Sequence, residues 1–113
     1  MPMQIETDTS GGYLAVTVTG DRIDAAGAIQ FKEAMRQAIQ DPASRVVLDL
    51  SRVAFLDSSG LGAVVAVKKL LAPGRDLELS GLTPGVAKVF RLTRMDSIFT
   101  IHSVLPEPLR DAG

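Results

Sequence analysis

The sequence contains no cysteine and a single histidine, His102. Without cysteine there can be no disulfide framework, zinc–thiolate cluster or thiol chemistry. One histidine gives no support for a Ser–His–Asp catalytic arrangement, and a lone histidine is more often a surface or packing residue. The sequence also lacks a Walker-type glycine loop and a Gly-x-Gly-x-x-Gly motif, so no recognised motif predicts nucleotide binding. We therefore expect no enzymatic activity, no metal site and no cofactor.

The chain lacks an excess of charge of either sign, because 12 basic and 13 acidic residues leave a net charge of −1. A non-specific nucleic-acid-binding protein would usually be clearly basic, so we expect no direct contact with nucleic acid. The segment Met1–Glu6 has no basic stretch followed by an apolar one, which argues against a signal peptide. No apolar run is long enough to cross a bilayer. We expect a soluble, cytoplasmic protein that does not associate with membranes.

Aromatic residues are scarce, at 4% of the chain, whereas hydrophobic residues make up 46% of its 113 residues. The core must therefore be built from valine, leucine, isoleucine and alanine. This length fits one compact domain over residues 1–113, with no internal repeat and no linker. The polar, proline-containing end at 106–113 is predicted to be a loose tail.

Periodicity predicts alternating strands and helices. The expected strands are 3–8, 13–19, 45–50 and 76–80, and the expected helices are 24–40, 59–71 and 84–93. Gly11-Gly12 predicts a hairpin between the first two strands, and Pro73-Gly74 a turn into the last. Strand–helix–strand order implies parallel pairing through right-handed crossovers. We expect an α/β fold in which a mixed, mostly parallel sheet of four to five strands packs with about four helices.

The segment Asp57–Gly62, with the sequence Asp-Ser-Ser-Gly-Leu-Gly, follows the apolar strand and opens the second helix. Its two hydroxyl groups therefore lie at a helix N-terminus. Free N–H groups and the helix dipole favour a negative group there, and a phosphate would be tolerated. Asp and Ser are also preferred helix caps, so Asp57 or Ser58 could simply start the helix. On the tetrapeptide alone, capping is the better interpretation.

The longer pattern around this segment resembles a STAS domain, the fold of bacterial anti-sigma factor antagonists, also called anti-anti-sigma factors. The resemblance is strongest from Val47 to Leu71, and it extends over about residues 4 to 102. Upstream, Val16–Gly20 and Ile23–Ala26 are similar to the strand, glycine and aspartate that precede the first helix in that family. Downstream, Leu79–Pro84 and the following helix are similar to the end of the family's domain.

Small side chains form a stripe along the second helix. At one hundred degrees per residue, Ser59, Gly62, Ala66 and Lys69 share one face, while Leu61, Val64, Val67 and Leu71 point largely toward the sheet. The stripe could pack against a neighbouring helix of the chain or receive a partner. A glycine inside a helix costs about 1 kcal/mol relative to alanine and needs a compensating reason. The physics leaves both options open, and the resemblance favours the partner.

The resemblance implies a role in partner switching that regulates transcription. In this family the phosphate acceptor is the second serine of the motif, which matches Ser59. The unphosphorylated protein would bind an anti-sigma factor, commonly a serine kinase, and release a sigma factor, while a serine phosphatase would reverse the modification. The expected contact residues are Asp24, Asp57, Ser58, Ser59, Gly60, Gly62, Ala63, Ala66 and Lys69. We expect a monomer or weak dimer.

A STAS-like adaptor subunit of a lipid-transport or stress-sensing assembly is the alternative function, and a small enzyme or nucleotide-binding module is less favoured than either. Two segments depart from the family pattern. Asp21–Asp24 is slightly longer than the usual Gly-x-Leu-Asp turn. Arg94-Met95 stands where family members often have Gly-Leu, so a helix-ending glycine is missing, at a small cost in stability.

Overall fold

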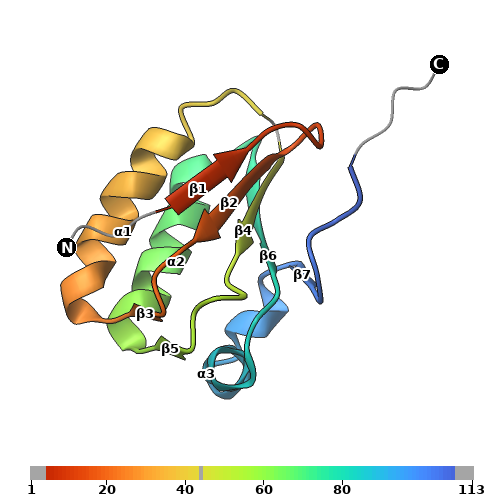
Figure 1. Ribbon diagram of the computed structural model, residues 1–113. Helices are drawn as coiled ribbons and strands as arrows, with labels where there is room; N and C mark the ends of the chain where they lie inside the picture. Colours follow the sequence, from red (N-terminus) through yellow and green to blue (C-terminus); the bar gives the residue numbers. More distant parts are fainter. Residues whose placement is uncertain (1–4, 44, 109–113) are drawn as a thin grey trace.

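The computed structural model describes residues 5–43 and 45–108, and it confirms the predicted α/β architecture (Figure 1). The main sheet has five strands in the order β1-β2-β4-β6-β7, in which β1 pairs antiparallel with β2 and the other pairs are parallel. These strands are β1 (Ile5–Asp8), β2 (Leu14–Val18), β4 (Arg45–Asp49), β6 (Asp76–Ser80) and β7 (Ile101–His102). Among the described residues the helices are α1 (Ala25–Ala38), α2 (Ser58–Leu71), α3 (Pro84–Leu92) and the 3-10 helix η1 (Met95–Ser97).

The predicted hairpin is present, and Gly12 takes a positive φ of 85° in its turn, which suits a residue without a Cβ. Residues 3 and 4 of the first predicted strand lie outside the described residues. The predicted turn after α2 is also present, with Gly74 at a φ of 97°. Because turns and strands fall where the sequence expects them, α1 and α2 follow as crossovers between parallel strands.

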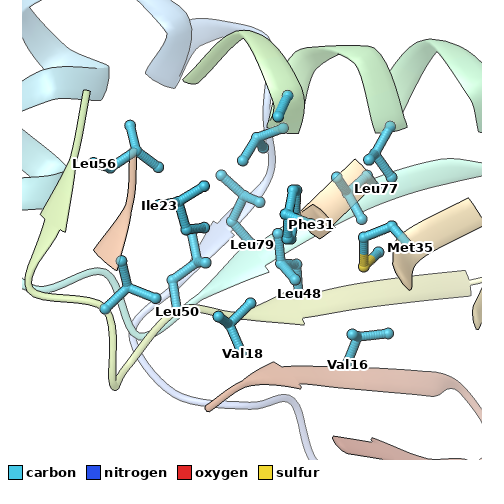
Figure 2. Packing of buried hydrophobic residues seen from close by; sticks show 14 of the residues in the cluster. Val16, Val18, Ile23, Phe31, Met35, Leu48, Leu50, Leu56, Leu77 and Leu79 are labelled. Atoms are coloured by element: carbon cyan, nitrogen blue, oxygen red, sulfur yellow. The ribbon is translucent and has the colours of Figure 1, made fainter. Parts of the chain in front are cut away.

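The main core lies between the sheet and the helices α1 and α2, which cover the same face of the sheet and pack against each other (Figures 1 and 2). Val16, Leu48 and Leu79 come from three neighbouring strands and are completely buried. Phe31 and Met35 of α1 are buried against them, one helical turn apart. Aliphatic residues from β2, β4 and β6 therefore supply one wall of the core and the two helices the other, as the composition predicts.

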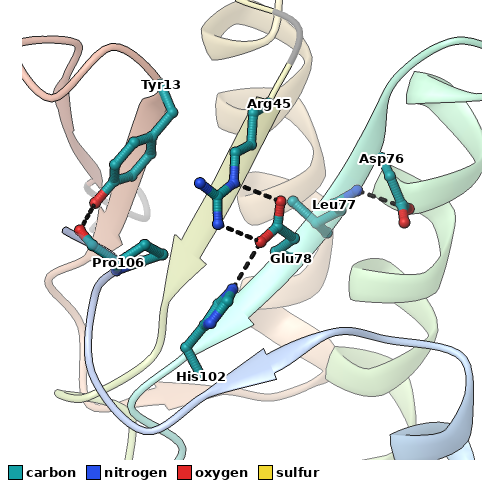
Figure 3. A network of polar contacts seen from close by, with 7 residues as sticks. All are labelled: Tyr13, Arg45, Asp76, Leu77, Glu78, His102 and Pro106. Atoms are coloured by element: carbon teal, nitrogen blue, oxygen red, sulfur yellow. Dashed lines mark hydrogen bonds and ion pairs between the residues drawn. The ribbon is translucent and has the colours of Figure 1, made fainter. Parts of the chain in front are cut away.

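The opposite face of the sheet carries a smaller buried cluster of Tyr13, Ala15 and Val47. The segment after β7 lies beside it: the Tyr13 hydroxyl donates to the carbonyl oxygen of Pro106 at 2.7 Å (Figure 3). Pro106 belongs to the tail that we predicted to be loose, and residues 109–113 of that tail lie outside the described residues. Among the helices that the structure describes, none is long and apolar enough to cross a membrane.

A second, two-stranded parallel sheet is absent from the sequence prediction. It pairs β3 (Arg22–Ile23) with β5 (Phe55–Leu56), and Ile23 lies opposite Leu56. Each strand leads directly into a helix, β3 into α1 and β5 into α2 (Figure 1). This small sheet therefore fixes the starting points of the two helices relative to each other.

Candidate functional site

The two long helices begin in the same way. The N–H of Gly27 donates to Oδ1 of Asp24 at 3.0 Å, and the N–H of Gly60 donates to Oδ1 of Asp57 at 2.9 Å. Both aspartates have extended backbone conformations, with ψ values of −171° and −172°. Of the two residues that the sequence offered as caps for the second helix, the structure uses Asp57. Ser58 is the first residue of α2 instead.

The pairing of β3 with β5 brings the two caps to one edge. Asp24 follows Ile23 and Asp57 follows Leu56, which are partners in the parallel register. The backbone N–H of Asp57 also donates to the carbonyl oxygen of Ile23, at 3.4 Å. The carboxylates of Asp24 and Asp57, both in the expected contact set, therefore come from neighbouring chain segments. They lie beside the first turn of α2.

Ser58 and Ser59 are exposed, at the first and second positions of α2. The first N–H groups of a helix have no intrahelical acceptor, and the dipole adds positive potential there. Because Asp57 supplies the cap, capping does not occupy the Ser59 hydroxyl. The arrangement leaves the Ser59 hydroxyl at an exposed position where added negative charge is compatible with the helix.

The predicted stripe is a surface of the folded domain. Ser59, Gly62 and Lys69 are exposed, and Ala66 is half-buried. A Cβ atom built on Gly62 would have no heavy atom within 4 Å apart from its immediate helical surroundings. Packing against a neighbouring helix of the same chain therefore does not explain Gly62. Of the two interpretations that the sequence left open, internal packing is therefore wrong at Gly62, and a surface for an external partner stays a prediction.

Two residues of the expected contact set do not belong to that surface. Gly60 is buried, and a Cβ at this position would lie 2.2 Å from the carbonyl oxygen of Ile23. Gly60 thus permits α2 to pack against the backbone of β3. Ala63 has 2% of its surface exposed and belongs to the main core. We correct the prediction accordingly: neither residue offers a side chain to a partner. Leu61, which we expected to face the sheet, is half-buried at the margin of the core.

Sequence reasoning missed two residues beside the helix starts. Phe55 of β5 has 45% of its surface exposed, which is unusual for a phenylalanine in a small domain. The guanidinium of Arg22, on the paired strand β3, lies 5.1 Å from the centroid of the Phe55 ring. A cation over an aromatic face is attracted by the ring quadrupole. Because β3 and β5 have two residues each, no periodicity marks them, and nothing in the sequence shows that Phe55 is exposed.

His102 takes part in a polar network on the helix-free face of the sheet (Figure 3). Arg45 donates to both carboxylate oxygens of Glu78, at 2.7 and 2.9 Å, and Nε2 of His102 lies 2.6 Å from Oε1 of Glu78. The hydrogen bonds from Arg45 lower the pKa of Glu78, and burial opposes this shift only in part. The network joins β4, β6 and β7, and His102 links the last of these strands to Glu78.

An open hollow lies between α3 and β7, lined on one side by Phe90 and Arg91 and on the other by Ile101 and His102. None of the residues at the start of α2 lines it. No group of three or more histidine, cysteine, aspartate or glutamate side chains is arranged to hold a metal ion within the part of the chain that the structure describes. The start of α2 therefore remains the candidate functional site.

Comparisons with known proteins agree with this fold. A family model described as "Mlab, STAS domain" matches residues 5–106. The chain is 32% identical over 100 residues to BtrV of Bordetella bronchiseptica, whose name gives it as an anti-sigma factor antagonist, and the alignment covers 88% of this chain and 85% of that protein.

Solved structures share the architecture. A crystal structure of an anti-sigma factor antagonist from Mycobacterium paratuberculosis matches with a TM-score of 0.81 at 26% identity, covering 91% of this chain and 87% of that one. The Bacillus cell fate determinant SpoIIAA in its phosphorylated form matches in fold, with a TM-score of 0.60 at 24% identity over 88% of this chain and 89% of that one. The chain belongs to the STAS domain family, among the anti-sigma factor antagonists.

Proposed function

We propose that this antagonist is controlled by phosphorylation of Ser59. In the unmodified form it binds an anti-sigma factor and thereby releases a sigma factor in the cytoplasm. The anti-sigma factor is also a serine kinase: it transfers the γ-phosphoryl group of ATP to Oγ of Ser59, with ADP as leaving group. A serine phosphatase hydrolyses the ester and restores the antagonist. Of its expected contact residues we retain the exposed or half-buried ones: Asp24, Asp57, Ser58, Ser59, Gly62, Ala66 and Lys69.

The observation that carries the proposal is the exposed Ser59 hydroxyl, one residue beyond a cap that Asp57 already supplies. The open space over Gly62, on the same face of α2, supports close approach of a partner beside it. A structural neighbour, SpoIIAA, is known in a phosphorylated form, which supports a phosphoswitch on this fold.

The proposed switch acts by charge and bulk. A phosphoryl group adds about −1.5 to −2 charge at neutral pH. At Ser59 it would join the carboxylates of Asp24 and Asp57 at one edge of the molecule, so that an acidic partner surface is repelled. The helix N-terminus accommodates the charge, so the domain keeps its fold. Binding is lost because the partner meets a new group, and no refolding is needed.

The test compares two adjacent serines. The anti-sigma factor of the same organism is incubated with the chain and Mg-ATP, and mass spectrometry locates the phosphate. Because Ser58 and Ser59 are both exposed neighbours, Ser58→Ala is a matched control. We expect Ser58→Ala to be labelled like the native chain and Ser59→Ala to remain unlabelled. A phosphate on Ser58, or efficient labelling of Ser59→Ala, would refute the assignment.

Calorimetry then measures how phosphorylation changes the affinity for the anti-sigma factor. The native chain and Ser59→Ala should bind the anti-sigma factor equally, and the phosphorylated chain should bind at least about tenfold more weakly, which corresponds to 1.4 kcal/mol. Ser59→Asp should weaken binding in part, with an unchanged or slightly higher melting temperature, because the dipole favours a carboxylate at this position. If the phosphorylated chain bound as tightly as the native one, an adaptor role in a different assembly would become the better proposal.

A further inference from the structure

Arg22 occupies a distinctive position beside the proposed phosphorylation site. Its Nε lies 3.8 Å from Oδ2 of Asp24, and its guanidinium lies over the ring of Phe55. The side chain is 61% exposed. It therefore reaches from β3 across to β5, the strand that runs directly into α2. Arg22 also belongs to the turn that is longer here than in the family pattern, so its role cannot be carried over from relatives.

Contacts made by their neighbours bring Arg22 and Ser59 into the same part of the molecule. Gly60 packs against the carbonyl oxygen of Ile23, the residue that follows Arg22. Ser59 immediately precedes Gly60, and Phe55, under the Arg22 guanidinium, lies four residues before Ser59. The long arginine side chain and the Ser59 hydroxyl thus extend into solvent from adjacent pieces of backbone.

We propose that Arg22 is the internal receptor for the phosphate on Ser59, an inference that rests on the proposed function. In the unmodified chain Asp24 and Phe55 hold the guanidinium, through one exposed contact at 3.8 Å and one cation–π contact. Exposed single pairs of this kind contribute little to stability. A phosphate offers three strong acceptor oxygens and a bidentate geometry that suits a guanidinium. The guanidinium therefore turns from Asp24 to the phosphate when Ser59 is modified.

The acidic surroundings strengthen this preference. Asp24 and Asp57 cap the two helices, so two carboxylates flank the start of α2. A dianionic phosphate placed among them needs a cation to offset the repulsion, and Arg22 lies within the same cluster. When the guanidinium leaves Phe55, the exposed ring loses its cover. Phosphorylation then changes the partner-facing surface in two ways: it adds a charge at Ser59 and uncovers an aromatic ring at Phe55.

The test measures the phosphate directly by 31P NMR, on the full chain with phosphoserine genetically encoded at position 59. The chemical shift is followed from pH 4 to pH 8 in the native background, in Arg22→Gln, in Arg22→Lys and in Arg36→Gln. Arg36 is the matched control, because it is an exposed arginine in the last turn of α1, at the far end of that helix. Phosphoserine ordinarily loses its second proton with a pKa near 6.

We expect the pKa of the phosphate in the native background and in Arg36→Gln to lie about half a unit below that in Arg22→Gln, with Arg22→Lys in between. The difference should shrink in 1 M NaCl, because the contact is exposed. Identical titrations of the native background and Arg22→Gln would overturn the inference. The measurement needs no anti-sigma factor or kinase, so the two hypotheses can be refuted separately. Identical titrations would refute the Arg22 contact and leave the proposed switch untouched. Unchanged binding after phosphorylation would refute the switch and leave the Arg22 contact untouched.

Discussion

Two glycines in the first turns of α2 should respond in opposite ways to the same substitution. Gly60 and Gly62 are two residues apart, and both belong to the contact set expected from the sequence. At Gly62 a new methyl group would meet no neighbouring atom within 4 Å. At Gly60 it would lie 2.2 Å from the Ile23 carbonyl oxygen and 3.1 Å from Cγ2 of the same residue. The matched pair Gly62→Ala and Gly60→Ala therefore tests the packing of α2 directly.

Gly62→Ala should stabilise the domain. Glycine in a helix interior is less favourable than alanine by about 0.5 to 1 kcal/mol, and no steric clash offsets the gain here. For a domain of this size the melting temperature should rise by about 2 to 4 °C. Gly60→Ala gains the same propensity, but its methyl group must push the β3 backbone away from α2. We expect a net loss of about 1 to 3 kcal/mol and a clearly lower melting temperature.

Gly62→Ala should weaken binding to the anti-sigma factor, although it stabilises the domain. If the anti-sigma factor lays its backbone across the open space over Gly62, an added methyl group should weaken binding about fivefold or more. Gln37→Ala, at an exposed position near the far end of α1, is the control and should leave binding unchanged. Thermal unfolding and calorimetry provide the two measurements. A lower melting temperature for Gly62→Ala would refute the packing argument, and a more stable variant with native affinity would remove Gly62 from the contact surface.

Two further outcomes concern stability away from the site. Arg94 follows α3 with a φ of 60° and a ψ of 18°, a left-handed conformation that costs a residue with a Cβ about 1 to 2 kcal/mol. Arg94→Gly should therefore raise the melting temperature by a few degrees. The control Arg91→Gly lies within the helix and should lower the melting temperature. Because the hydrogen bonds from Arg45 hold the pKa of Glu78 below its ordinary value, the folded state gains stability above that ordinary value and loses it as the pH falls through the lower folded pKa. The difference in melting temperature between the native chain and Glu78→Gln should therefore shrink between pH 6 and pH 3, and a difference that is independent of pH would contradict this.

The sequence predicts the parts of the fold that have long, regular patterns. The strand 76–80 and the helices are recovered within about two residues at each end, because burial on one face imposes a clear periodicity. The sequence marks Arg94 only as the place of a missing helix-ending glycine, and the structure adds that this residue is left-handed. The strands β3, β5 and β7 have two residues each, too few for any period to be recognised.

In the candidate site, too, the sequence predicts what depends on local pattern and misses what depends on long-range pairing. The position of Ser59 at a helix start follows from local sequence, because an apolar strand, an Asp-Ser-Ser segment and an apolar helix occur in order. The helical period places Gly62 on the stripe with Ser59 and leaves Gly60 off it, yet the contact set expected from the resemblance included both. Their difference arises from β3, which is distant in sequence and packs under one of them. The contact of Arg22 with Phe55 depends on the same long-range pairing.

The way α2 is anchored explains why a modification at its start can act without refolding. The Asp57 cap and the contact of Gly60 with Ile23 hold the first turn from beneath, through groups that point into the domain. Ser59 lies between these two anchors and Gly62 lies just beyond them, and both residues are exposed. A charge on Ser59 therefore meets solvent, the helix dipole and neighbouring exposed groups, and none of the anchoring contacts has to break. Control of binding at this position requires a partner that approaches the outer face of the first two turns closely, which is where the chain keeps its smallest side chains.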